Sequence, residues 1–300
     1  MFVRSSLKAA FFACGLFALT PVAFSAQAAP VLVAQAQKQS AETVVNQGLQ
    51  FIQQGKLNEA IASFRQAARL NPKLAAAHYN LGLALRQAGK LQESATAFYQ
   101  ATQADPSFAL AFANLGAALL EGNNLKLAQD YLQRSIELDP RLGLAHYNFG
   151  LVMAEQKNFP RAAQAFQQAA QLSPTAPEPL FQLGAVYQKQ GKPNDAIAAF
   201  RQAIQRNPNY TEAHYSIGLV AYNQGKLNDA LSAFRQSTKT NPQFASGYYA
   251  AGLVFVRQNN FSEAERVLKY AKQLYVAQKN PSWAAKTDRQ LQQLRQLMAR

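Results

Sequence analysis

Apolar residues recur along this chain with the spacing of short amphipathic helices. In residues 75–88, His78, Leu81 and Leu85 fall on one helical face, with polar residues between them. Ala88-Gly89-Lys90 then interrupts the stripe, and a glycine there can adopt the left-handed conformation that ends a helix at little cost. The pattern therefore predicts helices of about a dozen residues joined by tight turns.

The same pattern returns every 34 residues, without an insertion. The proline column comprises Pro72, Pro106, Pro140, Pro174, Pro208 and Pro242. The glycine column comprises Gly48, Gly82, Gly116, Gly150, Gly184, Gly218 and Gly252. These columns define seven units, at residues 41–74, 75–108, 109–142, 143–176, 177–210, 211–244 and 245–278.

Each unit is predicted to be a pair of helices. Glycine ends the first helix in four units, and Asn123 and Asn259, which tolerate the left-handed conformation best after glycine, replace it in two others. The second helix is expected to begin at an N-cap that is Asn58, Asn194, Asn228 or Ser262 in four of the units. A single pair this short cannot bury its apolar stripe, so we expect the seven pairs to stack into one continuous core.

The period and its residues resemble the tetratricopeptide repeat (TPR) family over residues 41–278. In that family a bulky residue is followed by Leu-Gly, an aromatic residue, Ala, an aromatic residue, Ala and Pro. The fifth unit matches this order with Leu180, Leu183-Gly184, Tyr187, Ala196, Phe200, Ala203 and Pro208. The resemblance implies an all-α fold: a right-handed α-solenoid of seven helix-turn-helix repeats whose first helices line the concave face. Val276 stands where the last proline is expected, so the array is predicted to end there.

A further helix is predicted in residues 279–300. Ser282 is suited to cap it, and one face of residues 282–299 is apolar whereas the other carries Gln, Lys and Arg. Repeat arrays need a terminal element with a polar outer side, so this segment is predicted to be a C-terminal capping helix. The apolar face comprises Trp283, Thr287, Leu291, Leu294 and Met298.

Residues 1–28 have the features of a cleaved secretory signal peptide. Arg4 and Lys8 precede an apolar stretch, and Ala26-Gln27-Ala28 fits a small-residue cleavage site. Residues 29–40 are then expected to be a flexible leader.

Two alternatives remain open for this N-terminal segment, an uncleaved anchor and a lipid anchor on Cys14. Phe11-Phe12 makes a poor lipid-attachment motif ahead of that cysteine. Export to the periplasm is the expectation, with secretion, or a thylakoid lumen if the source is cyanobacterial, as variants of it. Cleavage would remove the single cysteine and leave a thiol-free chain, which suits an oxidising compartment.

Two columns just before Leu-Gly face the concave groove in the TPR pattern. An asparagine amide offers two donors and an acceptor, so consecutive asparagines can pair with the backbone of an extended peptide whatever its sequence. The arrangement resembles the asparagine ladder of O-GlcNAc transferases; the alternative is that asparagine merely suits this helical position. The second column reads Asn46, Asn80, Asn114, Asn148, Gln182, Ser216 and Ala250.

The preceding column is aromatic in five units. Rings there offer apolar contact at low entropic cost together with a polar tip. Because the asparagines stop at Asn148, the N-terminal half is predicted to hold peptide backbone and the C-terminal half to grip apolar side chains. The aromatic members are Tyr79, Tyr147, Phe181, Tyr215 and Tyr249.

Other chemistry finds little support. The three histidines lie two repeats apart, on the order of 20 Å, so they are expected to pack between helix pairs and not to share a metal ion. Nucleophile elbows, phosphate loops and dinucleotide fingerprints are absent from the sequence, so we expect no enzyme, no metal and no cofactor. A carboxylate clamp for acidic chaperone tails is disfavoured too, because Arg86 is the only basic candidate among the lining positions of the N-terminal half.

Charge gathers at the C-terminal end. Only 15% of residues are charged, yet residues 245–300 carry nine basic and three acidic side chains. This end suits an acidic protein or lipid surface, or it is simply a solvated cap that keeps the array soluble; export argues against nucleic acid. The expected function is a non-catalytic protein-interaction scaffold that binds a peptide segment in its concave groove, in envelope or membrane-complex assembly. The alternatives are a chaperone-like assembly factor for a photosynthetic or secretion complex, and a structural spacer acting through its surface.

Overall fold

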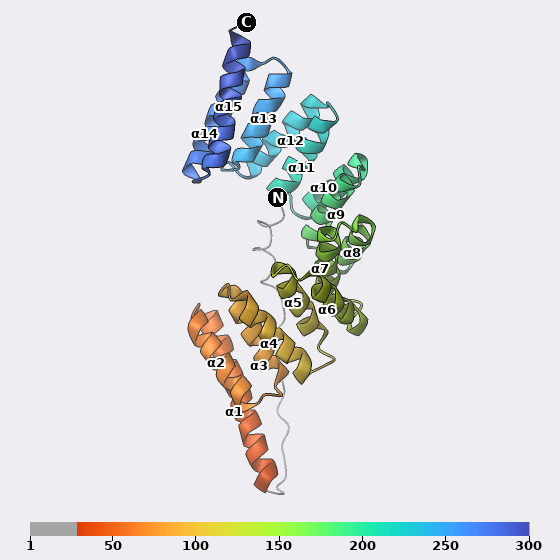
Figure 1. Ribbon diagram of the computed structural model, residues 1–300, viewed down its shortest axis with the longest axis vertical. Helices are drawn as coiled ribbons and strands as arrows, with labels where there is room; N and C mark the ends of the chain where they lie inside the picture. Colours follow the sequence, from red (N-terminus) through yellow and green to blue (C-terminus); the bar gives the residue numbers. More distant parts are fainter. Residues whose placement is uncertain (1–28, 300) are drawn as a thin grey trace.

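The computed structural model describes residues 29–299, and these residues form fifteen α-helices and no strand. The predicted all-α solenoid of stacked helix pairs is confirmed (Figure 1). The first helices of the seven pairs are α1 (Ala29–Gln53), α3 (Ala75–Gln87), α5 (Ala109–Glu121), α7 (Gly143–Glu155), α9 (Glu178–Lys189), α11 (Thr211–Asn223) and α13 (Ala245–Arg257). The second helices are α2 (Leu57–Leu70), α4 (Leu91–Ala104), α6 (Leu125–Leu138), α8 (Phe159–Leu172), α10 (Pro193–Arg206), α12 (Leu227–Thr240) and α14 (Phe261–Ala277), and α15 (Pro281–Met298) follows.

The turns inside the pairs follow the predicted glycine column. Gly89 has φ of +75°, and the glycines at the equivalent positions are similarly left-handed. Asn123 and Asn259 adopt φ of 60° and 56°, as their replacement of glycine predicts. Lys157 occupies the same column with φ of 60°, which costs more for a side chain of this type.

The predicted N-caps of the second helices are wrong by two residues. Asn58 and its equivalents already lie inside the helix, and the N-cap is the residue just after the left-handed turn. Asn158 fills this position in α8, where its side chain accepts a hydrogen bond from the backbone N–H of Arg161. Lysine fills it in α2, α4, α10 and α12 and provides no side-chain cap.

The glycine column lets the two helices of each pair approach closely. A Cβ on Gly82 would come within 2.7 Å of the ring of Phe98, and a Cβ on Gly184 would come within 2.5 Å of the ring of Phe200. Both rings are completely buried. The glycine on one helix and the buried side chain on its partner, a ring in five pairs and Leu132 or Leu268 in the other two, therefore fix the spacing inside each pair.

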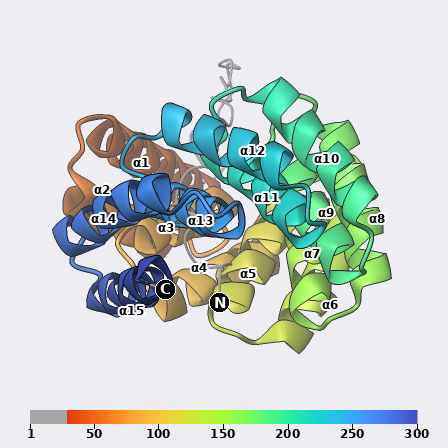
Figure 2. The ribbon, with the colours of Figure 1, turned by 90° about the horizontal axis from the view of Figure 1, so that it is seen from above.

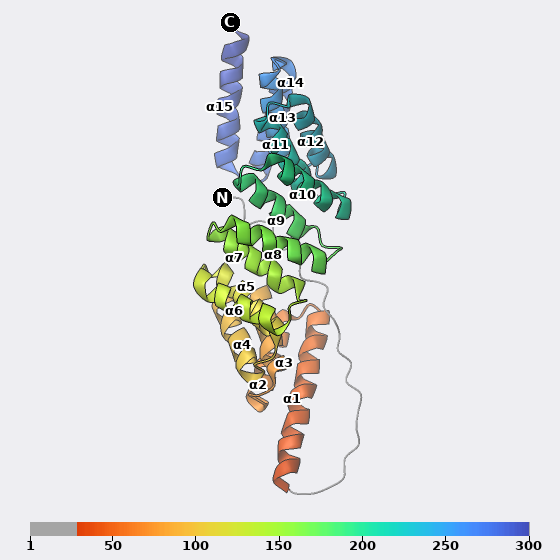
Figure 3. The ribbon, with the colours of Figure 1, turned by 90° about the vertical axis from the view of Figure 1, so that its right-hand side faces the viewer.

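Residues 29–40 are helical in the structure, not the flexible leader expected. They form the N-terminal half of α1, which extends past the end of α2 (Figures 1 and 3). Alanine and glutamine, which dominate this segment, are good helix formers, and this propensity explains the difference. The predicted signal peptide, residues 1–28, lies outside the described residues.

Helix α15 stands beside α14 at the C-terminal end (Figure 3). It buries Thr287, Leu291 and Leu294, as the apolar face predicts, whereas half of Met298 is exposed. Its N-cap is Asn280 and not Ser282, because Asn280 Oδ1 accepts a hydrogen bond from the N–H of Trp283 and Pro281 opens the helix.

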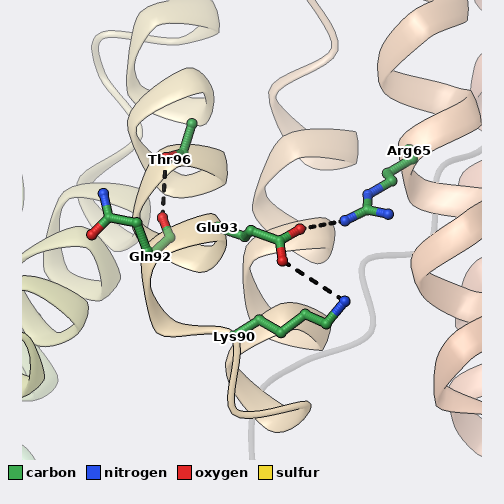
Figure 4. A network of polar contacts seen from close by, with 5 residues as sticks. All are labelled: Arg65, Lys90, Gln92, Glu93 and Thr96. Atoms are coloured by element: carbon green, nitrogen blue, oxygen red, sulfur yellow. Dashed lines mark hydrogen bonds and ion pairs between the residues drawn. The ribbon is translucent and has the colours of Figure 1, made fainter.

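Polar contacts join neighbouring pairs on the outer surface. The guanidinium of Arg65 on α2 pairs with Glu93 on α4, and Lys90 Nζ lies 3.7 Å from the same carboxylate (Figure 4). All three side chains are about half exposed, so these ion pairs add little to stability. Within residues 29–299, none of the helices has the length and apolar content that crossing a membrane requires.

Candidate functional site: the inner face of the solenoid

The first helices line the inside of the solenoid and the second helices lie outside them. Viewed along the long axis, α7, α9 and α11 run inside α8, α10 and α12 (Figure 2). The two columns singled out in the sequence belong to these inner helices. The inner face is therefore the surface on which the predicted binding residues must be judged.

Side chains on the inner face meet across repeats at a spacing of 35 residues, one more than the repeat. The side-chain amide of Asn114 contacts the hydroxyl of Tyr79, and the guanidinium of Arg86 pairs with Glu121. At the other end, Arg257 Nη1 donates to the carbonyl of Tyr222. Successive inner helices are thus offset by one residue where their side chains meet.

The asparagine column divides into accessible and buried members. Asn46 is exposed, and Asn80 is half-buried with its Nδ2 donating to the carbonyl of Ala76, one turn earlier in α3. Asn114 and Asn148 are 2% and 3% exposed. The first two can meet a ligand directly, whereas the other two lie beneath the surface in this conformation.

The buried asparagines differ in their partners. Asn114 Nδ2 donates to the carbonyl of Leu110 at 2.9 Å and to the hydroxyl of Tyr79 at 3.3 Å. Asn148 stands 35 residues after Ala113, which has no hydroxyl to offer, and its Nδ2 has no hydrogen-bond partner among the described residues. The Oδ1 of Asn114 is likewise buried without a partner.

Gln182 continues the column in α9, 35 residues after Tyr147 on α7. Burial raises the pKa of Tyr147 to about 12, and the side chain of Gln182 opposes the rise. The 35-residue offset therefore relates a tyrosine hydroxyl to an amide twice, between the second and third repeats and between the fourth and fifth. Binding of a peptide by the amide column stays a prediction, and part of its hydrogen-bonding capacity already joins neighbouring repeats.

The aromatic column is packed more deeply than a free binding surface would be. The ring of Tyr79 lies 5.7 Å from that of Phe98 and 5.0 Å from that of Phe108. Tyr215 packs in the same way, and its ring lies 5.5 Å from Phe234 and 5.2 Å from Phe244. Each ring thus fills the angle between the two helices of its own unit, and burial raises the pKa of Tyr215 to about 12, with the neighbouring Tyr275 adding to the rise. Phe181 packs on Phe200 and Tyr210 in the same angle.

Arg86 is not an open cation on the inner face. Its guanidinium is paired with Glu121 of the next inner helix, and the two side chains are 13% and 20% exposed. A clamp for carboxylates needs uncompensated positive charge, which this pair does not provide. The Arg86–Glu121 pair therefore gives a structural reason why a carboxylate clamp is disfavoured in the N-terminal half.

The C-terminal end of the inner face holds a group of residues that sequence reasoning did not assemble. Tyr249 on α13 packs edge-to-face on Trp283 of α15, with ring centroids 5.5 Å apart. Lys286 Nζ lies 4.1 Å from the centre of the Trp283 ring and 5.5 Å from that of Tyr249. We call Tyr222, Tyr249, Trp283 and the cations on them the terminal cluster. The 35-residue spacing, applied between Tyr222 and Arg257, would have revealed part of it.

The three histidines act as packing residues. His78 Nε2 lies 2.9 Å from the carbonyl of Pro72, and His146 and His214 make the same contact with Pro140 and Pro208. Each histidine so ties the start of one repeat to the proline turn before it. Residues 29–299 contain no group of His, Cys, Asp and Glu side chains placed to hold a metal ion.

Models of the TPR repeat match most of the described chain. One matches residues 48–89 and 150–191, a second matches 181–243 and 215–277, and a third matches 75–108 and 109–142. The chain belongs to the tetratricopeptide repeat family. No curated protein matches it.

Solved structures of TPR proteins share the fold. YrrB, a TPR protein with an unusual peptide-binding site, is 27% identical, with a TM-score of 0.51 over 64% of this chain and 99% of YrrB. A TPR protein from Parabacteroides merdae is 20% identical, with a TM-score of 0.63 over 83% and 99% of the two chains. Pseudomonas aeruginosa pilF is 19% identical, with a TM-score of 0.60 over 69% and 94%. The last two likenesses concern the fold alone.

Proposed function

We propose that this TPR protein is a non-catalytic scaffold that binds a peptide segment of a partner protein on its inner face. TPR repeats indicate protein partners, and we assign the partner to the inner face of the solenoid. One observation carries it: the first two inner helices, α1 and α3, leave the amides of Asn46 and Asn80 accessible at the 34-residue interval of the repeat. A regular row of donors and acceptors suits an extended backbone better than a compact ligand.

Support for a peptide comes from YrrB, which has a peptide-binding site and resembles most of this array. The neutral Arg86–Glu121 pair favours a segment that is not highly charged over the N-terminal half. Half-buried rings such as Phe181 and Tyr215 offer apolar edges further along. The proposal keeps a backbone-binding N-terminal end, at Asn46 and Asn80, and an apolar C-terminal half.

The setting proposed is assembly of an envelope or membrane complex by an exported protein. The signal-peptide pattern of residues 1–28 supports this setting. A chaperone-like factor that holds unassembled subunits would use the same inner face, whereas a structural spacer would act through its outer surface.

Affinity capture with two matched variants tests the proposal. Asn46→Ala with Asn80→Ala removes the accessible amides of the inner face, and neither side chain joins one repeat to another in the described chain. Gln92→Ala with Gln103→Ala removes two exposed amides from α4 as the control. We expect a partner from envelope extract that the wild type and the control retain and the inner-face variant loses.

The opposite pattern of partner loss would place the binding site on the outer surface. A partner lost with the α4 control and kept by the inner-face variant would assign binding to the outer surface and the function to a spacer. N-terminal sequencing of the exported chain gives a separate check on localisation, because cleavage is expected near Ala29.

A further inference from the structure

The terminal cluster combines an aromatic floor with positive charge. Tyr249 is 7% exposed, Trp283 is half-buried, and Lys286 lies over both rings. Tyr275 stacks on Trp283 from the core side, with the centroids 5.5 Å apart, and its hydroxyl lies 3.1 Å from the Oγ of Ser246. The floor is therefore held in place by α13, α14 and α15 together.

Three cations surround this floor. Lys286 lies above it, and the Arg257 guanidinium carbon lies 4.3 Å from the centre of the Tyr222 ring. Burial and the neighbouring Tyr222 raise the pKa of Tyr249, and the positive charge of Arg289, one turn after Lys286 on α15, opposes the rise. Lys286 and Arg289 thus both act on Tyr249, whereas Arg257 covers Tyr222.

These cations differ from most of the other basic residues of this end. Lys269 and Arg295 lie against Glu265, and Lys272 against Asp288 at 2.5 Å. Within residues 29–299, Arg257, Lys286 and Arg289 have no acidic partner within ion-pair distance. Unmatched positive charge therefore gathers at the aromatic floor, and the three acids of this end, Glu263, Glu265 and Asp288, pair with other basic residues.

We propose that the terminal cluster binds an acidic peptide segment carrying an aromatic or aliphatic side chain. Its carboxylates would pair with Lys286, Arg289 and Arg257, and its apolar side chain would cover the accessible part of Trp283, which Tyr249 supports from below. The inference rests on the proposed function and names the chemistry that the partner presents to the last repeats. The acidic residues of the partner would therefore bind where α13 meets the capping helix α15, and not on the asparagine column.

A peptide suits this site better than a membrane. The column of Tyr249 lies on the inner face of the solenoid, and a flat bilayer cannot follow a concave surface of this kind. Rings under ammonium and guanidinium groups also hold the cations in a fixed place, which favours a discrete ligand over a diffuse surface potential.

The single tryptophan of the chain makes the test direct, because Trp283 lies in the proposed site. We would follow its fluorescence while titrating a Glu-rich peptide with interspersed Phe, beside the same peptide with Gln for every Glu. Vesicles of phosphatidylglycerol and phosphatidylcholine form a third arm. We expect the Glu peptide to bind saturably, with an affinity that falls as salt is added. We expect no binding of the Gln peptide or of the vesicles at the same concentration.

Two charge-matched variants complete the design. Lys286→Gln with Arg289→Gln is expected to weaken the Glu peptide roughly tenfold, because two exposed ion pairs are lost. Lys226→Gln with Lys239→Gln, at two exposed positions before and within α12, removes the same charge and is expected to leave binding within about twofold.

Three results would overturn the inference: equal binding of the Gln peptide, equal loss in both variants, or a response to vesicles alone. Each of them leaves the inner-face capture experiment untouched, since Asn46 and Asn80 lie at the opposite end of the array. Failure here and failure of the proposed function are therefore distinguishable.

Discussion

The hydroxyl of Tyr79 on α3 lies 3.3 Å from the side-chain nitrogen of Asn114 on α5, one repeat further along. Asn114 is fully enclosed, so this contact is part of the packing between the second and third repeats. An asparagine that sequence places in a ligand-binding column thus also joins two repeats.

Replacing Asn114 by Ala should destabilise the protein more than replacing Asn80. Asn114→Ala removes a buried amide and leaves the Tyr79 hydroxyl without this donor, at a cost of about 1–3 kcal/mol. Asn80→Ala removes only a contact within its own helix and should stay within about 0.5 kcal/mol of the wild type. Urea unfolding of both variants measures the difference, and equal midpoints would contradict it.

The glycine column should not tolerate alanine. Gly184→Ala would bring a Cβ to 2.5 Å from the buried ring of Phe200, and we expect a loss of about 1–3 kcal/mol from overpacking. Gly122 is the control, because a Cβ there meets nothing closer than 3.5 Å and its φ is −77°. Gly122→Ala should be neutral, or stabilise by up to about 1 kcal/mol. Thermal unfolding tests both, and a lower midpoint for Gly122→Ala would refute the steric account.

Lysine at the start of the second helices leaves room for stabilisation. Lys226 is the N-cap of α12, has no side-chain cap hydrogen bond and sits at the positive end of the helix dipole. Lys226→Asn should raise stability by about 0.5–1 kcal/mol, whereas Asn158→Ala should lower it by a similar amount in α8. If both changes shift the unfolding midpoint in the same direction, capping is not the cause.

Alkaline pH should weaken the fold through its buried tyrosines. Burial raises the pKa of Tyr147 and of Tyr215 from 10 to about 12, so the folded chain holds these protons more tightly than the unfolded chain. Their contribution is complete below pH 10 and is lost as pH rises from 10 through 12. The melting temperature should fall across this window, and less so for Tyr147→Phe with Tyr215→Phe. Parallel curves for the two proteins would rule these tyrosines out.

The architecture can be predicted from the sequence alone because the same turn and packing residues recur in every repeat. The turn at Gly89 and the contact between Gly82 and Phe98 are local features, and a fixed interval copies them along the chain. The segment 29–40 is less predictable because it stands outside the period, and its composition suits both a loose leader and a helix.

The site was predictable only as columns. Columns state which residues share a face, but not how far one repeat is shifted against the next. The shift decides that Asn114 meets Tyr79 and that Arg86 meets Glu121. Trp283 was assigned to an apolar capping face, because the angle between α13 and α15 that brings it to Tyr249 has no signature in the sequence.

Apart from the contacts between its own two helices, each helix pair of this array packs almost entirely against the pairs beside it. For this reason the elasticity of the array depends on the contacts between neighbouring pairs. A small rotation at each of these junctions adds up to a large change in the pitch of the superhelix. A partner bound across several repeats fixes that pitch. In the scaffold role proposed above, a pull on the bound partner would be shared among all junctions, so the array would extend before any one contact had to break.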